Sequence, residues 1–350
     1  MKTLKWLSLS SSSILLVFIL FACKKDKVSK YGTDGGGTAQ AAPCENFTYT
    51  EPAIVLLEVH SDTQYTEPCF SPFTDDEFVY VRYVPGSAPP EVVKYTISTK
   101  TEQVLCTSFE TGCFPLGSPD WGAQGKIIFN VGTGNSGIGY IINDDGSNLQ
   151  QFLPSNINFT SPKFNGDGSK IVSGGSSLPN YHCPIYDLFS NVVDSFPFRF
   201  STNTYGIGLP AYFNGDFTDG LFSYADYSKS PVEIGLAYLD SDTIVKPLLT
   251  TNNPDGYTVT DIDKFQHLVY YVIYGLGFYQ YNETTGVTTL LQEMCDSRKI
   301  INITVSQISG NILIEEMKNT LGSGAGGVDI QSNIYLFNPY TRVKKPILVE

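Results

Sequence analysis

Basic residues are scarce in this chain, and their scarcity excludes one class of partner. Lysine and arginine together number 22 against 35 aspartate and glutamate residues, which leaves a formal net charge of −13. Arginine occurs only at Arg82, Arg199, Arg298 and Arg342. Because binding to nucleic acid phosphates requires concentrated Lys and Arg, the sequence predicts no nucleic acid partner.

Residues typical of catalytic and metal sites are also rare. The three histidines, His60, His182 and His267, lie far apart, and there is no Cys-x-x-Cys pair. The fragment 322–327 contains Gly-Ser-Gly but lacks the strand and helix of a nucleophile elbow, so it is expected to be a loop. The sequence therefore predicts no catalytic residue, no metal and no cofactor, and favours a non-catalytic protein.

Helical periodicity is missing as well. No apolar pattern with a 3.6-residue period persists for three turns, so helices should be minor or absent. Methionine occurs 3 times, whereas tyrosine and phenylalanine occur 22 times each and are interrupted by 32 glycines and 20 prolines. Aromatic strands separated by Gly and Pro turns are typical of an all-β protein.

The N-terminus reads as a secretion signal. Lys2 and Lys5 precede an unbroken apolar run, Ile14 to Phe21, which ends in Ala22 and Cys23. An uncleaved membrane helix is the alternative, but eight apolar residues after a Ser-rich run are short for a bilayer span. The sequence thus predicts a signal peptide over residues 1–22.

The residues directly before Cys23 indicate which type of signal peptide this is. Leu20-Phe21-Ala22-Cys23 resembles a bacterial lipobox, with an aliphatic first position, a small residue before the cleavage and the Cys itself. The resemblance implies that Cys23 becomes a diacylated N-terminus, so that the lipid is the protein's only attachment to the membrane.

A flexible tether is expected to follow over residues 23–45, because this stretch is rich in Gly, Thr and Ala without apolar periodicity. The residues after Cys23 are mostly lysines, Lys24, Lys25 and Lys27 around a single Asp26, which favours the periplasmic leaflet of the bacterial outer membrane. Surface display, known for Bacteroidetes lipoproteins with acidic runs at this place, is the alternative. Loss of Lys2 and Lys5 with the signal changes the net charge to −15.

Six cysteines remain after Cys23, an even number that permits disulfides in an exported protein. Cys106 and Cys113 flank a short segment, so a local bridge between them is a plausible expectation. A bridge between Cys44 and Cys69 is a weaker alternative.

A repeat organises the rest of the chain. Thr160 to Val172 combines a Ser-Pro entry, an Asn-Gly-Asp-Gly turn and an apolar exit strand, the signature of a β-hairpin. Weaker copies recur, and their prolines at 68, 119, 162 and 210 are spaced by 51, 43 and 48 residues. Two copies without proline follow at 259–272 and 303–314.

Each copy is followed by two further strands, such as Ile138 to Asn143 and Asn148 to Leu153 after the second copy. Four antiparallel strands repeated six times predict a single β-propeller over residues 46–350. The sequence does not decide which strand closes the ring of blades. Ile54 to Val59 and Val343 to Val349 would both suit the outer position of the last blade, so seven blades is the alternative to six.

Two stretches carry a family resemblance. Ser161-Pro162 with 166–171, and Tyr140 to Asn148, resemble the repeat of TolB-like propellers. The usual tryptophan of that repeat is replaced by another aromatic residue, such as Phe70, Phe164 or Tyr212. The resemblance implies a propeller that acts as an interaction module of the cell envelope.

The acidic turns at Asn143–Asn148 and Asn165–Ser169 have two interpretations. Alternating oxygen ligands suit calcium, but Asp and Asn also form tight turns by accepting hydrogen bonds from their own backbone. Neither turn carries the later glutamate of an EF-hand, and both lie where the repeat requires a hairpin. A structural role is therefore favoured.

The functional prediction is a lipid-anchored, monomeric propeller that binds an envelope protein or peptide through loops around one mouth of its channel. Glycan binding or processing is the alternative, because exposed aromatic rings stack on sugar faces. Candidate rim residues, all placed in loops, are Tyr181, Tyr205, Tyr227 and Tyr257.

Overall fold

The computed structural model describes residues 63–84, 89–111, 116–132, 137–152, 160–174, 182–189, 193–197, 205–210, 221–226, 229–238, 244–252, 259–294, 298–321 and 328–348. The chain divides into two units, Met1–Pro43 and Cys44–Glu350. Every described residue belongs to the second unit. None of the described segments forms a helix long and apolar enough to span a bilayer.

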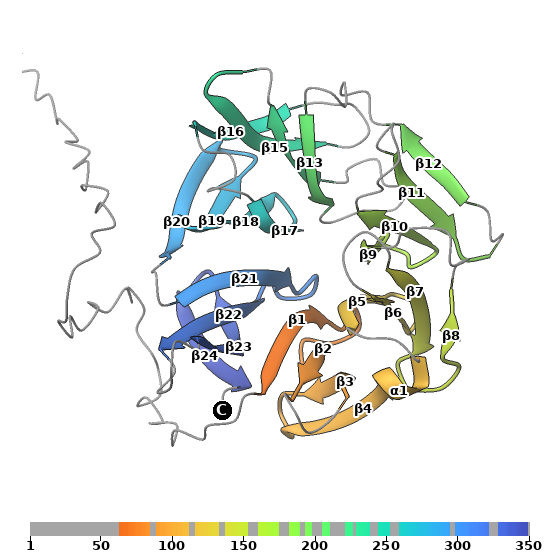
Figure 1. The fold of residues 1–350 in the computed structure, drawn as a ribbon. Coiled ribbons are helices and arrows are strands. Elements are labelled where there is room, and N and C mark those ends of the chain that lie inside the picture. Colours follow the sequence, from red (N-terminus) through yellow and green to blue (C-terminus); the bar gives the residue numbers. More distant parts are fainter. Residues whose placement is uncertain are drawn as a thin grey trace, which may run out of the picture. The chain divides into compact units, whose positions relative to one another are not determined.

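Six four-stranded antiparallel sheets, here called blades 1 to 6 in chain order, make up this unit (Figure 1). The strands of blades 1 to 3 are β1 (Gln64–Phe70), β2 (Glu77–Tyr83), β3 (Glu91–Thr96), β4 (Thr101–Thr107), β5 (Leu116–Gly122), β6 (Lys126–Val131), β7 (Ile138–Asn143), β8 (Gln150–Gln151), β9 (Thr160–Phe164), β10 (Lys170–Gly174), β11 (His182–Asp187) and β12 (Val193–Pro197). Those of blades 4 to 6 are β13 (Tyr205–Pro210), β14 (Leu221–Asp226), β15 (Val232–Tyr238), β16 (Ile244–Thr251), β17 (Val259–Phe265), β18 (Leu268–Ile273), β19 (Gly277–Asn282), β20 (Val287–Glu293), β21 (Arg298–Val305), β22 (Ile312–Leu321), β23 (Val328–Asn338) and β24 (Val343–Leu348).

The all-β propeller with six four-stranded blades is thus confirmed, and the seven-blade alternative is wrong. Strand β24 occupies the outer position of blade 6, next to β23. The competing segment 54–59 lies outside the described residues. A single helix turn, α1 (Ser108–Thr111), follows β4 among them.

Burial follows the position of a strand within its blade. All six residues of the second strand of blade 5, β18, are buried, because both of its faces pack against neighbouring blades. By contrast, the first four residues of the outer strand β4 are exposed. The continuous apolar runs of the second strands are therefore what a strand buried on both faces requires.

The cores lie between adjacent blades. Val79 and Val92 of blade 1 share a cluster with Trp121 and Phe129 of blade 2. Tyr80 of blade 1 shares another with residues of blade 6, such as Leu313 and Ile334. Apolar packing therefore joins the first blade to the last.

The repeat unit of the sequence is a hairpin, as predicted. Phe164 at the end of β9 pairs with Ile171 of β10, and the turn between them is 165–169. The N–H of Gly168 donates to the carbonyl of Asn165 at 2.9 Å, and Phe164 is buried, in agreement with its expected core role.

Two boundaries differ from those predicted. β8 contains only Gln150–Gln151, shorter than the strand predicted up to Leu153. β21 starts at Arg298, five residues before the predicted copy. In β21 the pairing with β22 extends back to Arg298, which lies opposite Lys318, so the partner strand decides where the strand begins.

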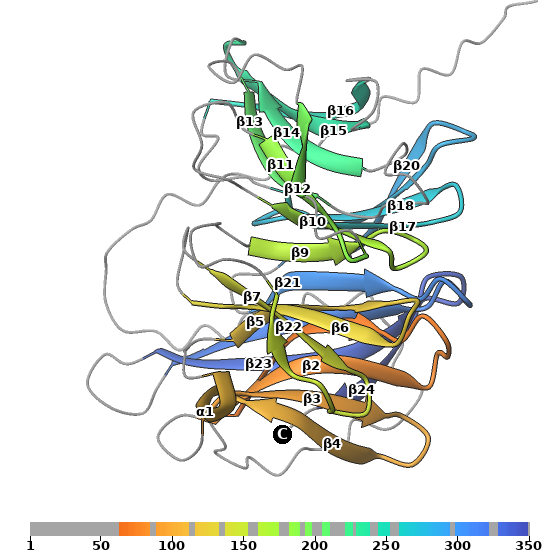
Figure 2. The ribbon, with the colours of Figure 1, turned by 90° about the vertical axis from the view of Figure 1, so that its right-hand side faces the viewer.

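The hairpins that connect the first strand of a blade to its second, and the third to its fourth, lie at the same end of the blade. In blade 1, for example, the N–H of Ile97 in the second hairpin donates to the carbonyl of Asp76 in the first at 2.7 Å. Figure 2 shows β9 and β21 running in the same direction, toward the side where their hairpins lie. This side is called the hairpin face below.

Candidate functional site

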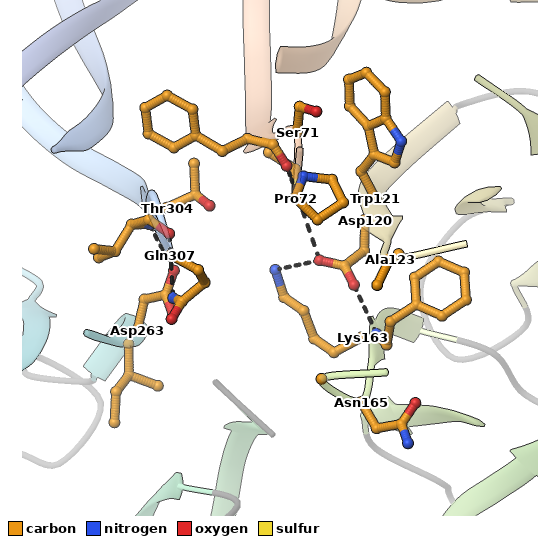
Figure 3. A pocket seen from close by; sticks show the side chains of 17 residues that line it. Ser71, Pro72, Asp120, Trp121, Ala123, Lys163, Asn165, Asp263, Thr304 and Gln307 are labelled. Atoms are coloured by element: carbon orange, nitrogen blue, oxygen red, sulfur yellow. Dashed lines mark hydrogen bonds and ion pairs between the residues drawn. The ribbon is translucent and has the colours of Figure 1, made fainter. Parts of the chain in front are cut away.

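A cavity of about 130 Å³ opens at the hairpin face, between the ends of the innermost strands (Figure 3). Five inner strands, β1, β5, β9, β17 and β21, contribute residues to its wall. Polar side chains of the wall include Asp120, Lys163, Asp263 and Thr304. Each lies within the last three residues of its strand, so the repeat places them in a ring.

The Ser-Pro entry of the repeat forms an irregularity in the inner strand. Pairing of β1 with β2 shifts between Thr66 and Cys69, and pairing of β5 with β6 shifts between Gly117 and Asp120. Pro68 and Pro119 lie within these shifts. Because proline has no backbone N–H to donate a hydrogen bond to a neighbouring strand, it is tolerated at bulges and on edge strands. The bulge then redirects the residues that follow it, including Cys69 and Asp120.

Inner strands are edge strands, so some of their N–H groups have no strand partner, and carboxylates from the preceding blade serve as acceptors. Asp120 accepts the N–H of Phe164 at 2.6 Å. In the described segments, the N–H of Ile303 likewise donates to Asp261 and the N–H of Val305 to Asp263, both at 2.7 Å. Part of the acidity around the channel is therefore architectural.

Lys163 carries the ammonium group of the cavity. Its Nζ lies 3.3 Å from Oδ1 of Asp120, and its side chain is 33% exposed. Burial disfavours the ammonium, but the charges of Asp120, Asp261 and Asp263 outweigh burial and raise the pKa of Lys163. The lysine is therefore charged at neutral pH.

The carboxyl groups of β17 titrate near neutral pH. Burial raises the pKa of Asp263 to about 7, and it raises the pKa of Asp261 to about 6. Lys163 and the backbone N–H donors oppose both shifts. Near pH 7, Asp263 thus exists in both protonation states.

Cys69 is the thiol of the cavity wall. Its Sγ lies 3.5 Å from Oδ1 of Asp120, and burial together with the charge of Asp120 raises the pKa of the thiol. Nucleophilic cysteines require a lowered pKa. Cys69 is accordingly a neutral thiol, and the described wall contains no histidine to activate it.

Most of the site residues predicted from the sequence do not line this cavity. Cys23, Cys113, Tyr181, Tyr227 and Tyr257 lie outside the described residues. Tyr205 is the first residue of strand β13, so its predicted placement in a loop is wrong. The lipid anchor and the tyrosine rim stay predictions.

Cys106 is buried in the core between blades 1 and 2, where burial raises the pKa of its thiol to about 12. Because its proposed partner Cys113 is not described, the disulfide also stays a prediction. His267 is exposed in the turn between β17 and β18.

The acidic turns use their side chains internally. Asp145 accepts the N–H of Ser147, and Asp167 accepts the N–H of Ser169, each at 2.8 Å. These bonds are those of tight Asx turns, which favours their structural interpretation. Among the described residues, no group of three or more His, Cys, Asp or Glu side chains is arranged to hold a metal ion.

The cavity itself was missed at the sequence level. Asp120, Lys163 and Asp263 appear there only as members of repeat copies. The available signal was their common place, a charged residue just before the first hairpin of a copy. Strand alternation directs such a residue toward the channel, away from the blade core.

No protein-family model and no curated protein matches the sequence. Among solved structures, the chain is similar to TolB from Acinetobacter baumannii, with a TM-score of 0.54 and 13% identity over 79% of this chain. The match spans 64% of the TolB chain. This likeness shows the fold alone.

Two other propellers have lower scores. The β-propeller domain of the Trilobed protease from Pyrococcus furiosus has a TM-score of 0.46 and 12% identity, over 82% of this chain and 84% of that one. The acylaminoacyl peptidase of Pyrococcus horikoshii has a TM-score of 0.48 and 10% identity, over 82% of this chain and 52% of that one.

Proposed function

We propose that this chain is a lipid-anchored propeller of the bacterial outer membrane that faces the periplasm and binds a protein or peptide segment at its hairpin face, without catalysing a reaction. The observation that carries the proposal is the coincidence of the cavity with exposed large apolar side chains on the same face. Four of these lie in hairpin turns: Phe73, Phe189, Ile308 and Tyr340.

Two of these side chains adjoin the cavity directly. Phe73 follows the wall residue Pro72, and Ile308 follows the wall residue Gln307. They are 55% and 51% exposed. Their turns belong to adjacent blades, 1 and 6, and a hydrogen bond from the hydroxyl of Ser306 to Asp75 joins them. We call Phe73 and Ile308 the apolar rim.

Further apolar surface surrounds the apolar rim. Tyr340 is 61% exposed in the outer hairpin of blade 6. The hydroxyl oxygen of Tyr340 lies 3.2 Å from the position that a Cβ atom on Gly310 would occupy. The tyrosine therefore reaches the turn that carries Ile308. Apolar side chains gathered around a polar cavity are typical of a protein interaction site.

The chemistry of the described wall supports binding rather than catalysis. Its thiol, Cys69, is held neutral, and its single ammonium, that of Lys163, is paired with Asp120. Covalent catalysis requires an activated nucleophile, and the raised pKa of the Cys69 thiol is the opposite of activation.

The anchoring part of the proposal rests on the sequence. Lys2, Lys5 and the apolar run before Cys23 form the signal, and residues 23–45 would let the propeller move away from the membrane surface.

The test is capture from a detergent-solubilised envelope with the mature chain immobilised through its C-terminus. We expect one envelope protein to be enriched and the double variant Phe73→Ser/Ile308→Ser to lose it. Val104, 44% exposed on the outer strand β4, gives the matched control Val104→Ser, which should retain the partner.

A glycan array run in parallel addresses the alternative. Retention of a specific oligosaccharide by the wild-type chain, with no dependence of protein capture on the apolar rim, would contradict the proposal.

A further inference from the structure

The charges of the cavity do not balance. The ammonium of Lys163 is paired with Asp120, and it is the single cation among the described residues that line the cavity, whereas Asp263 adds a second carboxyl group to the wall. Asp261 lies two residues earlier in β17, and the charge of Lys163 acts on both aspartates. Glu315 lies close enough to raise the pKa of Asp261 further. Among the described residues in and beside the cavity, carboxyl groups therefore outnumber cations.

Asp263 retains capacity to accept hydrogen bonds. Its Oδ1 accepts the N–H of Lys264 and its Oδ2 the N–H of Val305, both at 2.7 Å. A carboxylate offers about four lone-pair positions. Each oxygen can therefore accept one further bond from a group in the cavity.

Thr304 provides an independent indication of a ligand. It lines the cavity and is only 5% exposed, yet its hydroxyl has no hydrogen-bond partner among the described residues. Figure 3 shows Thr304 and Asp263 on the side of the cavity opposite Asp120, with the Lys163 ammonium directed at Asp120. The hydroxyl faces the cavity, where it can exchange a hydrogen bond with a bound group.

The shape and walls fit an alkyl stem. Phe70, Pro72, Ile262 and Val305 contribute apolar surface to the wall, and the cavity of about 130 Å³ is close to the size that accommodates a benzene ring. A group of about six non-hydrogen atoms thus fits, with its polar end near Asp263 and Thr304.

We propose that the cavity binds a primary ammonium group on an unbranched alkyl stem, namely a lysine side chain of the bound protein segment, with Asp263 and Thr304 as acceptors. This inference rests on the proposed function and specifies its ligand. The apolar rim then contacts side chains that flank the lysine.

Binding should depend on pH, because a cation favours the charged form of nearby carboxyl groups. The charged or titratable groups around the site are Asp120, Lys163, Asp261, Asp263, Glu315 and the Cys69 thiol. Of these, Asp263 and Asp261 change charge between pH 5 and 8. An ammonium ligand should therefore bind more tightly at pH 8 than at pH 5.

The experiment uses pentylammonium chloride as a lysine side-chain probe, with 1-pentanol and sodium pentanoate as uncharged and anionic controls. Isothermal calorimetry on the mature chain should give a dissociation constant on the order of 1 mM for pentylammonium at pH 8. Binding should be about tenfold weaker at pH 5, and the two controls should not bind. Preferential binding of pentanoate, or equal binding at both pH values, would overturn the inference.

Three variants locate the site. Asp263→Asn and Thr304→Val should each weaken pentylammonium binding, by about tenfold for the aspartate variant. Asp145→Asn alters an exposed carboxylate in the turn after β7 and should leave binding unchanged, which controls for general attraction to an acidic protein. Circular dichroism identifies any variant that does not fold, and Thr304→Val keeps the test decisive if Asp263→Asn fails.

The outcomes separate this inference from the proposed function. If wild type captures its partner through the apolar rim but does not bind pentylammonium, the lysine assignment is wrong and the binding function stands. If pentylammonium binds and no partner depends on the apolar rim, the cavity chemistry stands and the proposed function fails.

Discussion

The backbone N–H of Glu67 donates a hydrogen bond of 2.8 Å to Oε2 of Glu315, and this bond joins the first blade to the last across 248 positions of the chain. Glu315 also accepts bonds from Ser332 and Asn302. Glu67 has a φ of 53° and lies within the bulge of β1, between the paired residues Thr66 and Cys69. In the described part of the chain, this bond and the shared core of blades 1 and 6 close the ring.

Removal of the Glu315 carboxylate should weaken this closure. Glu315→Ala would leave the Glu67 N–H, the Asn302 amide and the Ser332 hydroxyl without their acceptor in a buried site, at a cost of about 3 kcal/mol. Urea denaturation measures the loss. Glu293 is exposed at the end of β20, and Glu293→Ala should change stability by less than about 0.5 kcal/mol. Equal losses in the two variants would contradict this role of Glu315.

The hairpin of blade 3 depends on a glycine. Gly168 has a φ of +71°, and a Cβ there would lie 2.9 Å from the backbone nitrogen of Ala123 in blade 2. Gly286 has a φ of +69° with nothing within 4 Å of such a Cβ. Gly286→Ala should cost about 1 kcal/mol through backbone strain alone, and Gly168→Ala about 2 kcal/mol more. Thermal or urea unfolding of both variants measures the difference, and equal costs would show that the contact with blade 2 is not tight.

Stability should respond to the titration of Asp263. Burial raises its pKa from 3.8 to about 7, so between these values the folded state binds more protons than the unfolded state. The contribution of this group to stability therefore falls as pH rises from about 4 to about 7. Asp263→Asn lacks that contribution, so its stability deficit relative to wild type should be larger at pH 5 than at pH 8. If the stability deficit of Asp263→Asn does not change with pH, the pKa of Asp263 is not raised in the folded protein.

Lipid attachment should depend on Cys23. Because Cys23 supplies the only acylation site that the lipobox resemblance implies, Cys23→Ala should yield either soluble protein or an unprocessed precursor. Membrane fractionation and electrophoretic size measure this, and Cys44→Ala is the matched control within the predicted tether region. Unchanged fractionation and size of Cys23→Ala would refute the anchor.

Much of the fold was predictable because each blade contains a sequence pattern formed by neighbouring residues. The Ser-Pro entry, the Asn-Gly-Asp-Gly turn and the apolar exit strand of residues 160–172 are local signals. Their spacing gave the propeller and its six blades. Copies without proline were located less accurately, as the early start of β21 shows.

The candidate site was not predictable in the same way. Asp120, Lys163 and Asp263 come from blades 2, 3 and 5, and each one alone is an ordinary charged residue before a hairpin. Their chemistry depends on how near they are to one another. Only closure of the ring sets those distances.

By itself, then, the sequence determined the strand pattern, the turn chemistry and the acidic balance of the chain, because these depend on neighbouring residues. The tertiary structure decided that the proline of the repeat sits in a bulge and that the residue after it faces a shared cavity. It also decided that two carboxyl groups there titrate near neutral pH. Burial and charge pairing depend on segments brought together by folding, and no local pattern encodes them.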